Sequence, residues 1–160
     1  MTAFPFPNDS AAIPRTSLIF GFGPMLPLAA AAIGAWVLPA PWPGIAIALA
    51  ILWGVLILAF VAGVRRGFAF GDPAATTRTA IATMLAYFMP AGIALVLAYG
   101  DMPAAALTLL MLGYVLVLVL DRHAARRGEA PAHFARLRPP QMAIAVIALA
   151  ALLVRLLAGV

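Results

Sequence analysis

Five long apolar runs, separated by segments that hold nearly all of the charged residues, dominate this chain of 160 residues. About 20 apolar residues in a helix suffice to cross the hydrocarbon core of a bilayer. The runs do not alternate as barrel strands do, and helices satisfy their own backbone groups within lipid. The pattern therefore predicts membrane helices at about residues 17–38, 44–64, 79–98, 103–120 and 140–158.

We expect an all-α, polytopic membrane protein in which about five transmembrane helices form a compact bundle. Residues 1–16 form a polar arm with several prolines, and residues 17–160 form a single membrane domain. The composition agrees, because 66% of the residues are hydrophobic and only 9% are charged. A soluble domain is about half apolar and about a quarter charged.

Arginine marks one side of the predicted bundle. All ten basic residues are Arg, and nine of them lie in the arm or in the connections 65–78 and 121–138. The positive-inside rule places that side in the cytoplasm, or in the matrix of a mitochondrion. We expect a bacterial inner-membrane protein with a cytoplasmic N-terminus and a periplasmic C-terminus. Trp36, Trp42 and Tyr99 fall at the opposite interface, where aromatic side chains are enriched.

Arg155 is the one arginine outside this pattern. It lies about one turn from the end of the last predicted helix. Its side chain either snorkels to the outer interface or pairs with a carboxylate such as Asp101.

The sequence offers little catalytic chemistry. It contains no Cys, which excludes disulfides and thiolate metal sites. His123 and His133 both lie in the connection 121–138, where a solvated loop is favoured over a two-His metal site. Apart from Arg155, no ionisable residue falls within a predicted helix, since Asp101 and Asp121 lie at helix ends. A proton-driven transporter is therefore disfavoured.

We accordingly expect no enzyme activity, no cofactor and no metal. A pI near 11 does not indicate nucleic acid, because the Arg residues lie between apolar segments and not on a soluble basic face.

Small residues recur at four-residue spacing in two predicted helices, as they do where membrane helices approach closely. Ala-rich composition is the alternative explanation. The residues are Ala46, Ala50 and Gly54 in the second helix, and Ala82, Ala86 and Ala94 in the third. Trp53, Tyr87 and Pro90 fall near the middle of the membrane, either as a candidate pocket or as ordinary packing.

The connection 121–138 mixes arginines with apolar residues. This composition suits a segment at anionic lipid headgroups, with a docking surface for a partner protein as the alternative. The candidate contact residues are Arg122, Arg126, Arg127, Phe134, Arg136 and Arg138.

Three short stretches resemble a family of multi-pass membrane proteins of unknown function (DUF3429-type). This family occurs in proteobacteria and includes the animal transmembrane protein 69-like mitochondrial proteins. The stretches are Ile13-Pro14 with Gly23-Pro24 and Pro27, the segment AFVAGVRRG at 59–67, and Asp121 leading to Ala130-Pro131 and Leu137-Arg138. The resemblance covers about residues 13–155. It implies membrane location and topology but no mechanism.

Two functions stay open. The first is a non-catalytic accessory or assembly subunit that packs against a larger membrane complex. The alternative is a small transporter, channel or lipophilic-ligand binder that acts as a homo-oligomer. A water-filled pathway would need polar residues on one helix face, for which the candidates are Thr83, Tyr87, Thr108 and Tyr114.

The predicted orientation can be tested with reporter fusions. A reporter active only in the periplasm, fused after Val160, is expected to be active, because five spans place the two termini on opposite sides. A reporter active only in the cytoplasm should be silent at the same position. The reverse pair of results would show that the number of spans is wrong by one.

Overall fold

Helices make up nearly all of the computed structural model, which describes residues 13, 15–68, 77–127 and 133–159. The elements are α1 (Arg15–Phe22), η1 (Gly23–Met25), α2 (Leu26–Val37), α3 (Trp42–Phe68), α4 (Thr77–Tyr99), α5 (Pro103–Arg126) and α6 (Phe134–Leu157). Most of the predicted arm, residues 1–12 and 14, lies outside the described residues, as do residues 69–76 of the first Arg-rich connection and 128–132 of the second.

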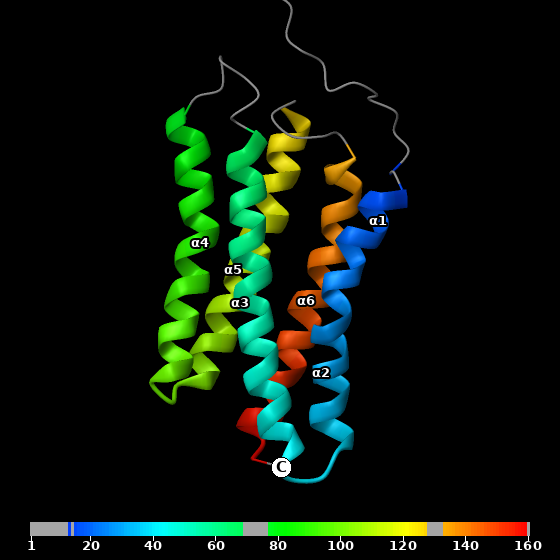
Figure 1. Ribbon diagram of the computed structural model, residues 1–160, viewed down its shortest axis with the longest axis vertical. Coiled ribbons are helices and arrows are strands. Elements are labelled where there is room, and N and C mark those ends of the chain that lie inside the picture. The colour runs from blue at the N-terminus through cyan, green and yellow to red at the C-terminus, as the bar shows by residue number, and fades with distance from the viewer. Residues whose placement is uncertain (1–12, 14, 69–76, 128–132, 160) are drawn as a thin grey trace, which may run out of the picture.

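Five stretches of helix are long and apolar enough to cross a membrane, and α1, η1 and α2 together form the first of them. The predicted fold class, an all-α polytopic bundle with five membrane helices, is confirmed. Each span packs against the next one in sequence, and α2 closes the ring by packing against α6. In Figure 1, α1 and α6 begin at one pole of the bundle, and α2 and α6 end at the other.

The pole where α1, α4 and α6 begin and where α3 and α5 end is named here the Arg-rich end. Its described arginines are Arg15, Arg65, Arg66, Arg78, Arg122, Arg126, Arg127, Arg136 and Arg138. The pole that carries the α2–α3 and α4–α5 turns is the opposite end. At the α4–α5 turn, Asp101 adopts a left-handed φ of 56°, a conformation that Asp tolerates better than most residues.

Prolines interrupt the first span. Pro24 and Pro27 have no N–H to donate, and the chain tightens into the 3₁₀ turn Gly23–Met25 between α1 and α2. A broken helix within a membrane needs other donors for its freed carbonyl groups. At this break Trp53 of α3 adds a side-chain donor, because its Nε1 donates to Pro24 O at 2.8 Å.

The last two helices are longer than their apolar runs. α5 continues past Leu120 to Arg126, and α6 begins at Phe134, six residues before Pro140. Ala and Arg are strong helix formers, so the helix continues after hydrophobicity ends. Both ends of the connection 121–138 are therefore helical and not loop.

Small residues line several helix contacts in the bundle. Ala50 and Ala94 are buried in the core, and Ala46 and Ala86 pack against it. Gly54 is also buried, and a Cβ there would lie 3.2 Å from Leu110 Cδ1.

Ala82 is the exception, since it is exposed. A helix turns about 100° per residue, so residues spaced by four drift about 40° per step. From Ala94 back to Ala82 this drift reaches about 120°, which carries Ala82 off the packed face. Its assignment to helix packing is wrong.

Gly113 allows α5 to approach two other helices. A Cβ at this position would collide with Leu58 of α3 and lie 3.4 Å from Pro90 Cβ of α4. Leu58 is fully buried, so its side chain has little room to give way.

We expect Gly113→Leu to lower the stability of the bundle by about 1–3 kcal/mol, because the new side chain overpacks the contact between α3, α4 and α5. Gly92→Leu on α4 is the matched control, since no atom lies within 4 Å of a Cβ there. Thermal unfolding of both variants in mild detergent measures the effect. Equal melting temperatures would contradict the close approach at Gly113.

Candidate functional site: a buried ion pair and two grooves

A polar cluster joins α4, α5 and α6 near the Arg-rich end. Arg138 Nε lies 2.9 Å from Asp121 Oδ2 in an ion pair, and the Tyr87 hydroxyl donates a hydrogen bond of 2.9 Å to Asp121 Oδ1. Asp121 is 2% exposed, Arg138 6% and Tyr87 0%. Charged side chains within membrane helices face the bundle interior and pair with one another, and these three residues follow that rule.

Gln141 extends the cluster to the first span. Arg138 Nη1 donates to Gln141 Oε1 at 3.0 Å, and Gln141 Nε2 donates to Gly21 O of α1 at 2.8 Å. The guanidinium of Arg138 also lies 4.5 Å from the centroid of the Phe134 ring. One continuous set of polar contacts therefore connects α1, α4, α5 and α6.

Two sequence-based expectations are wrong at this cluster. Asp121 was expected at a helix end with no buried ionisable group nearby, yet Asp121 and Arg138 are buried within helices, and Arg65 at the end of α3 is 8% exposed. Arg138 was also expected on the surface among the lipid- or partner-contacting residues. Both errors arose because α5 and α6 extend beyond the apolar runs that defined them.

The spacing of buried residues in α5 could have revealed Asp121. Its core stripe repeats at intervals of three and four, as expected for a helix face, and Asp121 occupies the next position of the same stripe. The stripe consists of Leu107, Leu110, Tyr114, Val117, Asp121 and Ala124. In α6, Arg138 and Gln141 likewise lie on the face that continues as Met142, Ala145 and Leu149.

The other residues of the predicted contact segment lie nearer the surface. Arg122, Arg126, Arg127 and Arg136 are exposed, and Phe134 is half-buried beside Arg138. Their contact with headgroups or with a partner stays a prediction.

The three residues of the candidate mid-membrane pocket lie apart. Tyr87 is buried on Asp121, and Pro90 packs near Gly113. Trp53 is 38% exposed on α3 and binds Pro24 O of the first span. The prediction that these residues share a pocket is therefore wrong, because Trp53 lies on the partly exposed side of α3 whereas Tyr87 points into the core.

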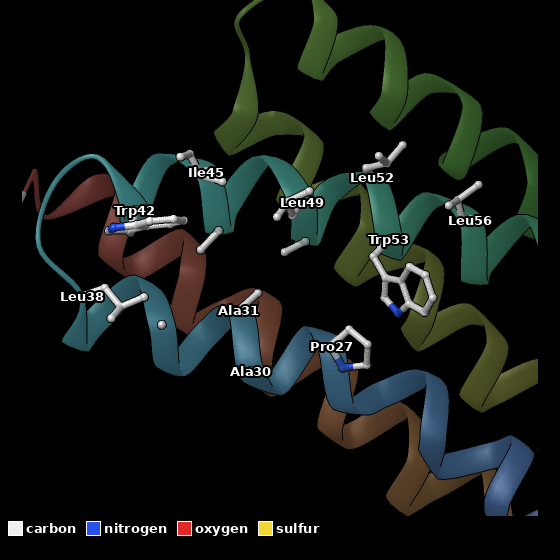
Figure 2. A pocket seen from close by; sticks show the side chains of 13 residues that line it. Pro27, Ala30, Ala31, Leu38, Trp42, Ile45, Leu49, Leu52, Trp53 and Leu56 are labelled. Atoms are coloured by element: carbon white, nitrogen blue, oxygen red, sulfur yellow. The ribbon is translucent and has the colours of Figure 1, made fainter.

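A groove of about 460 Å³ lies between α2 and α3 and is named here the α2–α3 groove. Small residues line both walls, and Figure 2 shows Trp42 and Trp53 toward its two ends. The lining residues are Pro27, Ala30, Ala31, Gly34, Leu38, Trp42, Ile45, Ala46, Leu49, Ala50, Leu52, Trp53 and Leu56.

A second groove of about 380 Å³ lies between α1, α3 and α6 and is named here the α1–α6 groove. Trp53 and Leu56 border both grooves. Unlike the α2–α3 groove, the α1–α6 groove is lined by part of the polar cluster, namely Arg138 and Gln141. Its lining residues are Ser17, Phe20, Gly21, Pro24, Met25, Trp53, Leu56, Ile57, Phe60, Val61, Val64, Phe134, Leu137, Arg138 and Gln141.

Arg155 makes its contacts at the opposite end of the bundle. Its Nε donates to Ala35 O of α2 at 2.8 Å, and its guanidinium lies 5.9 Å from the centroid of the Trp36 ring. Trp36 Nε1 in turn donates to Ala151 O of α6 at 3.1 Å. Arg155 of α6 thus donates to α2, and Trp36 of α2 donates to α6.

His133 precedes α6 at the Arg-rich end. Its Nε2 lies 3.5 Å from Ser17 Oγ of α1, and its ring meets the Phe134 ring edge-on at 5.1 Å. Burial lowers the pKa of His133, and the positive charge of Arg138 lowers it further. The neutral imidazole is therefore favoured at this position. Among the described residues, no group of three His, Cys, Asp or Glu side chains could hold a metal ion.

Comparison with known families decides which group of proteins this bundle represents. The sequence model of a family described as "Protein of unknown function (DUF3429)" matches residues 13–154, which include the first four spans and all but the last three residues of the fifth. The chain belongs to this family. The family match includes Asp121, Arg138 and Gln141, and so covers the whole polar cluster. No curated protein and no solved structure matches the chain.

Removing one member of the ion pair should strongly destabilise the protein. Asp121→Ala is expected to lower stability by about 3–5 kcal/mol, because it leaves the buried Arg138 guanidinium without its carboxylate. Arg122→Ala, an exposed neighbour on the same helix, should change stability little. Thermal unfolding in detergent measures both variants.

The double variant Asp121→Ala/Arg138→Ala tests the coupling directly. We expect it to be less destabilised than the sum of the two single variants, because no unpaired charge is left behind. Strict additivity would show that the pair contributes nothing as a pair.

Proposed function

We propose that this membrane protein is a non-catalytic accessory or assembly subunit that packs against a larger membrane complex. The observation that carries this proposal is the α2–α3 groove, whose apolar walls include the small residues Ala30, Ala31 and Gly34 on α2 and Ala46 on α3. Helix association in lipid depends on close van der Waals packing, which small residues permit. A groove of this composition suits an apolar helix of a partner.

The alternative of a channel or transporter receives less support. Thr83 and Thr108 bond to carbonyl groups of their own helices, and Thr108 is exposed. Tyr87 and Tyr114 are fully buried and donate to Asp121 and to Gly54 O. All four hydroxyl groups therefore donate within the bundle, and the buried tyrosines and the exposed Thr108 do not line a common path.

The orientation is part of the proposal. With the Arg-rich end in the cytoplasm of a bacterium, the N-terminus is cytoplasmic, the C-terminus is periplasmic and the membrane is the inner membrane. The charge distribution supports this orientation, because among the described residues nine Arg and only one acidic residue, Asp121, lie at the Arg-rich end.

Native purification tests the accessory role. The full chain, tagged at its C-terminus and extracted in mild detergent, is expected to migrate with other membrane proteins in fixed stoichiometry, as identified by mass spectrometry. Ala30→Trp should reduce this co-migration, because the indole fills the α2–α3 groove. Ala82→Trp, at an exposed position of α4, is the matched control and should leave the co-migration unchanged.

Two outcomes would contradict the proposal. One is migration of the native protein alone, as a monomer or a homo-oligomer. The other is equal recovery of partners with Ala30→Trp and with the native chain, which would remove the α2–α3 groove from the interface.

A further inference from the structure

The α1–α6 groove differs from an ordinary lipid-facing surface because it is polar at one end and apolar over the rest. Ser17, Arg138 and Gln141 line it near the Arg-rich end, whereas Phe20, Leu56 and Phe60 belong to its apolar part. Such an arrangement matches an amphiphile with its headgroup toward the Arg-rich end.

The length of the groove matches one leaflet of a bilayer. On α3 its lining runs from Trp53 to Val64, and eleven residues of helix span about 16 Å. Half of the hydrocarbon core is about 15 Å thick. The groove therefore extends from the interface to about the midplane, which is the reach of one acyl chain of a lipid.

The polar end offers donors held in fixed positions. Arg138 is held by Asp121 and Gln141, and Gln141 is held by Gly21 O. The rotamers of these side chains are thus set before a ligand arrives, which lowers the entropic cost of binding. Ser17 adds a hydroxyl group on the wall formed by α1.

The charge around the polar end favours an anion. Asp121 neutralises Arg138 locally, and Arg15 is exposed at the start of α1, which borders this end. In the described chain, Asp121 is the single acidic residue at the Arg-rich end. Each Arg near a headgroup adds about 1 kcal/mol of attraction for an anionic lipid.

From this geometry we propose that the α1–α6 groove is a specific binding site for an anionic phospholipid of the surrounding leaflet. One acyl chain lies along α3 between Leu56 and Val64, and the phosphate group lies at the polar end beside Ser17, Arg138 and Gln141. The site shares only Trp53 and Leu56 with the α2–α3 groove, and its polar end lies outside that groove, so it does not depend on the accessory role.

Lipid titration followed by native mass spectrometry tests the site. The full chain in detergent is mixed with phosphatidylglycerol or with phosphatidylcholine of the same acyl chains. We expect the native protein to retain phosphatidylglycerol roughly tenfold more tightly, a difference that one to two arginine contacts supply. Val64→Trp should lose this preference, because the indole fills the groove.

Val119→Trp is the matched control. Val119 is 56% exposed on α5, two residues before Asp121, and lines neither groove. It should bind phosphatidylglycerol like the native chain. If Val64→Trp fails to fold, Phe60→Ala removes a wall of the groove instead and should weaken binding, with Phe88→Ala on α4 as its control.

Three results would overturn the proposal. Equal retention of the two lipids would show that the headgroup is not recognised. A preference that persists in both groove variants would place the lipid on the exposed arginines and outside the groove. Purification of the native protein with a quinone or a free fatty acid that phosphatidylglycerol does not displace would give the groove a different occupant.

Discussion

The contact between Asp121 and Arg138 is the constraint on which the rest of the bundle depends. Either charge alone would be costly among apolar helices, so α5 and α6 must meet with these residues in register. Tyr87 then fixes the rotation of α4 against Asp121, and Gln141 fixes that of α1. Apolar side chains permit many rotations of a membrane helix, whereas a hydrogen-bonded ion pair permits few. At the Arg-rich end, four polar side chains therefore set the orientation of α1, α4, α5 and α6.

The opposite end uses neutral and cationic donors for the same purpose. Arg155 and Trp36 each reach a backbone carbonyl group on the partner helix, at Ala35 and Ala151. These contacts hold α2 to α6, which are the two helices that close the ring. Between the two ends the contact surfaces are made of small residues and a few large apolar ones. Polar contacts therefore hold the helices together at both ends of the bundle, and close apolar packing holds them together between the ends.

The sequence predicted the number of spans and the fold class, because hydrophobic length is the dominant constraint in a bilayer. It did not predict the polar cluster, because the same criterion ended two helices too early. Asp121 and Arg138 were treated as loop residues once hydropathy fell, although Asp121 continues the heptad-like stripe that begins at Leu107. Ala82 was misplaced because a spacing of four drifts around a helix. Trp53 and Tyr87 were expected at a similar depth in the membrane, but depth alone does not determine which face of the bundle a residue occupies.

The carbonyl groups of the first span have a consequence for how the protein is made. Gly21 O and Pro24 O are satisfied by side chains of α6 and α3, and the ribosome makes both helices after the first span. Of the five described spans, the first in sequence thus gains its last side-chain bond from the fifth. Until α6 has packed, Gly21 O of α1 lacks the side-chain donor that Gln141 supplies. During synthesis, the side-chain bonds of the first described span are therefore complete only after the fifth span has been made.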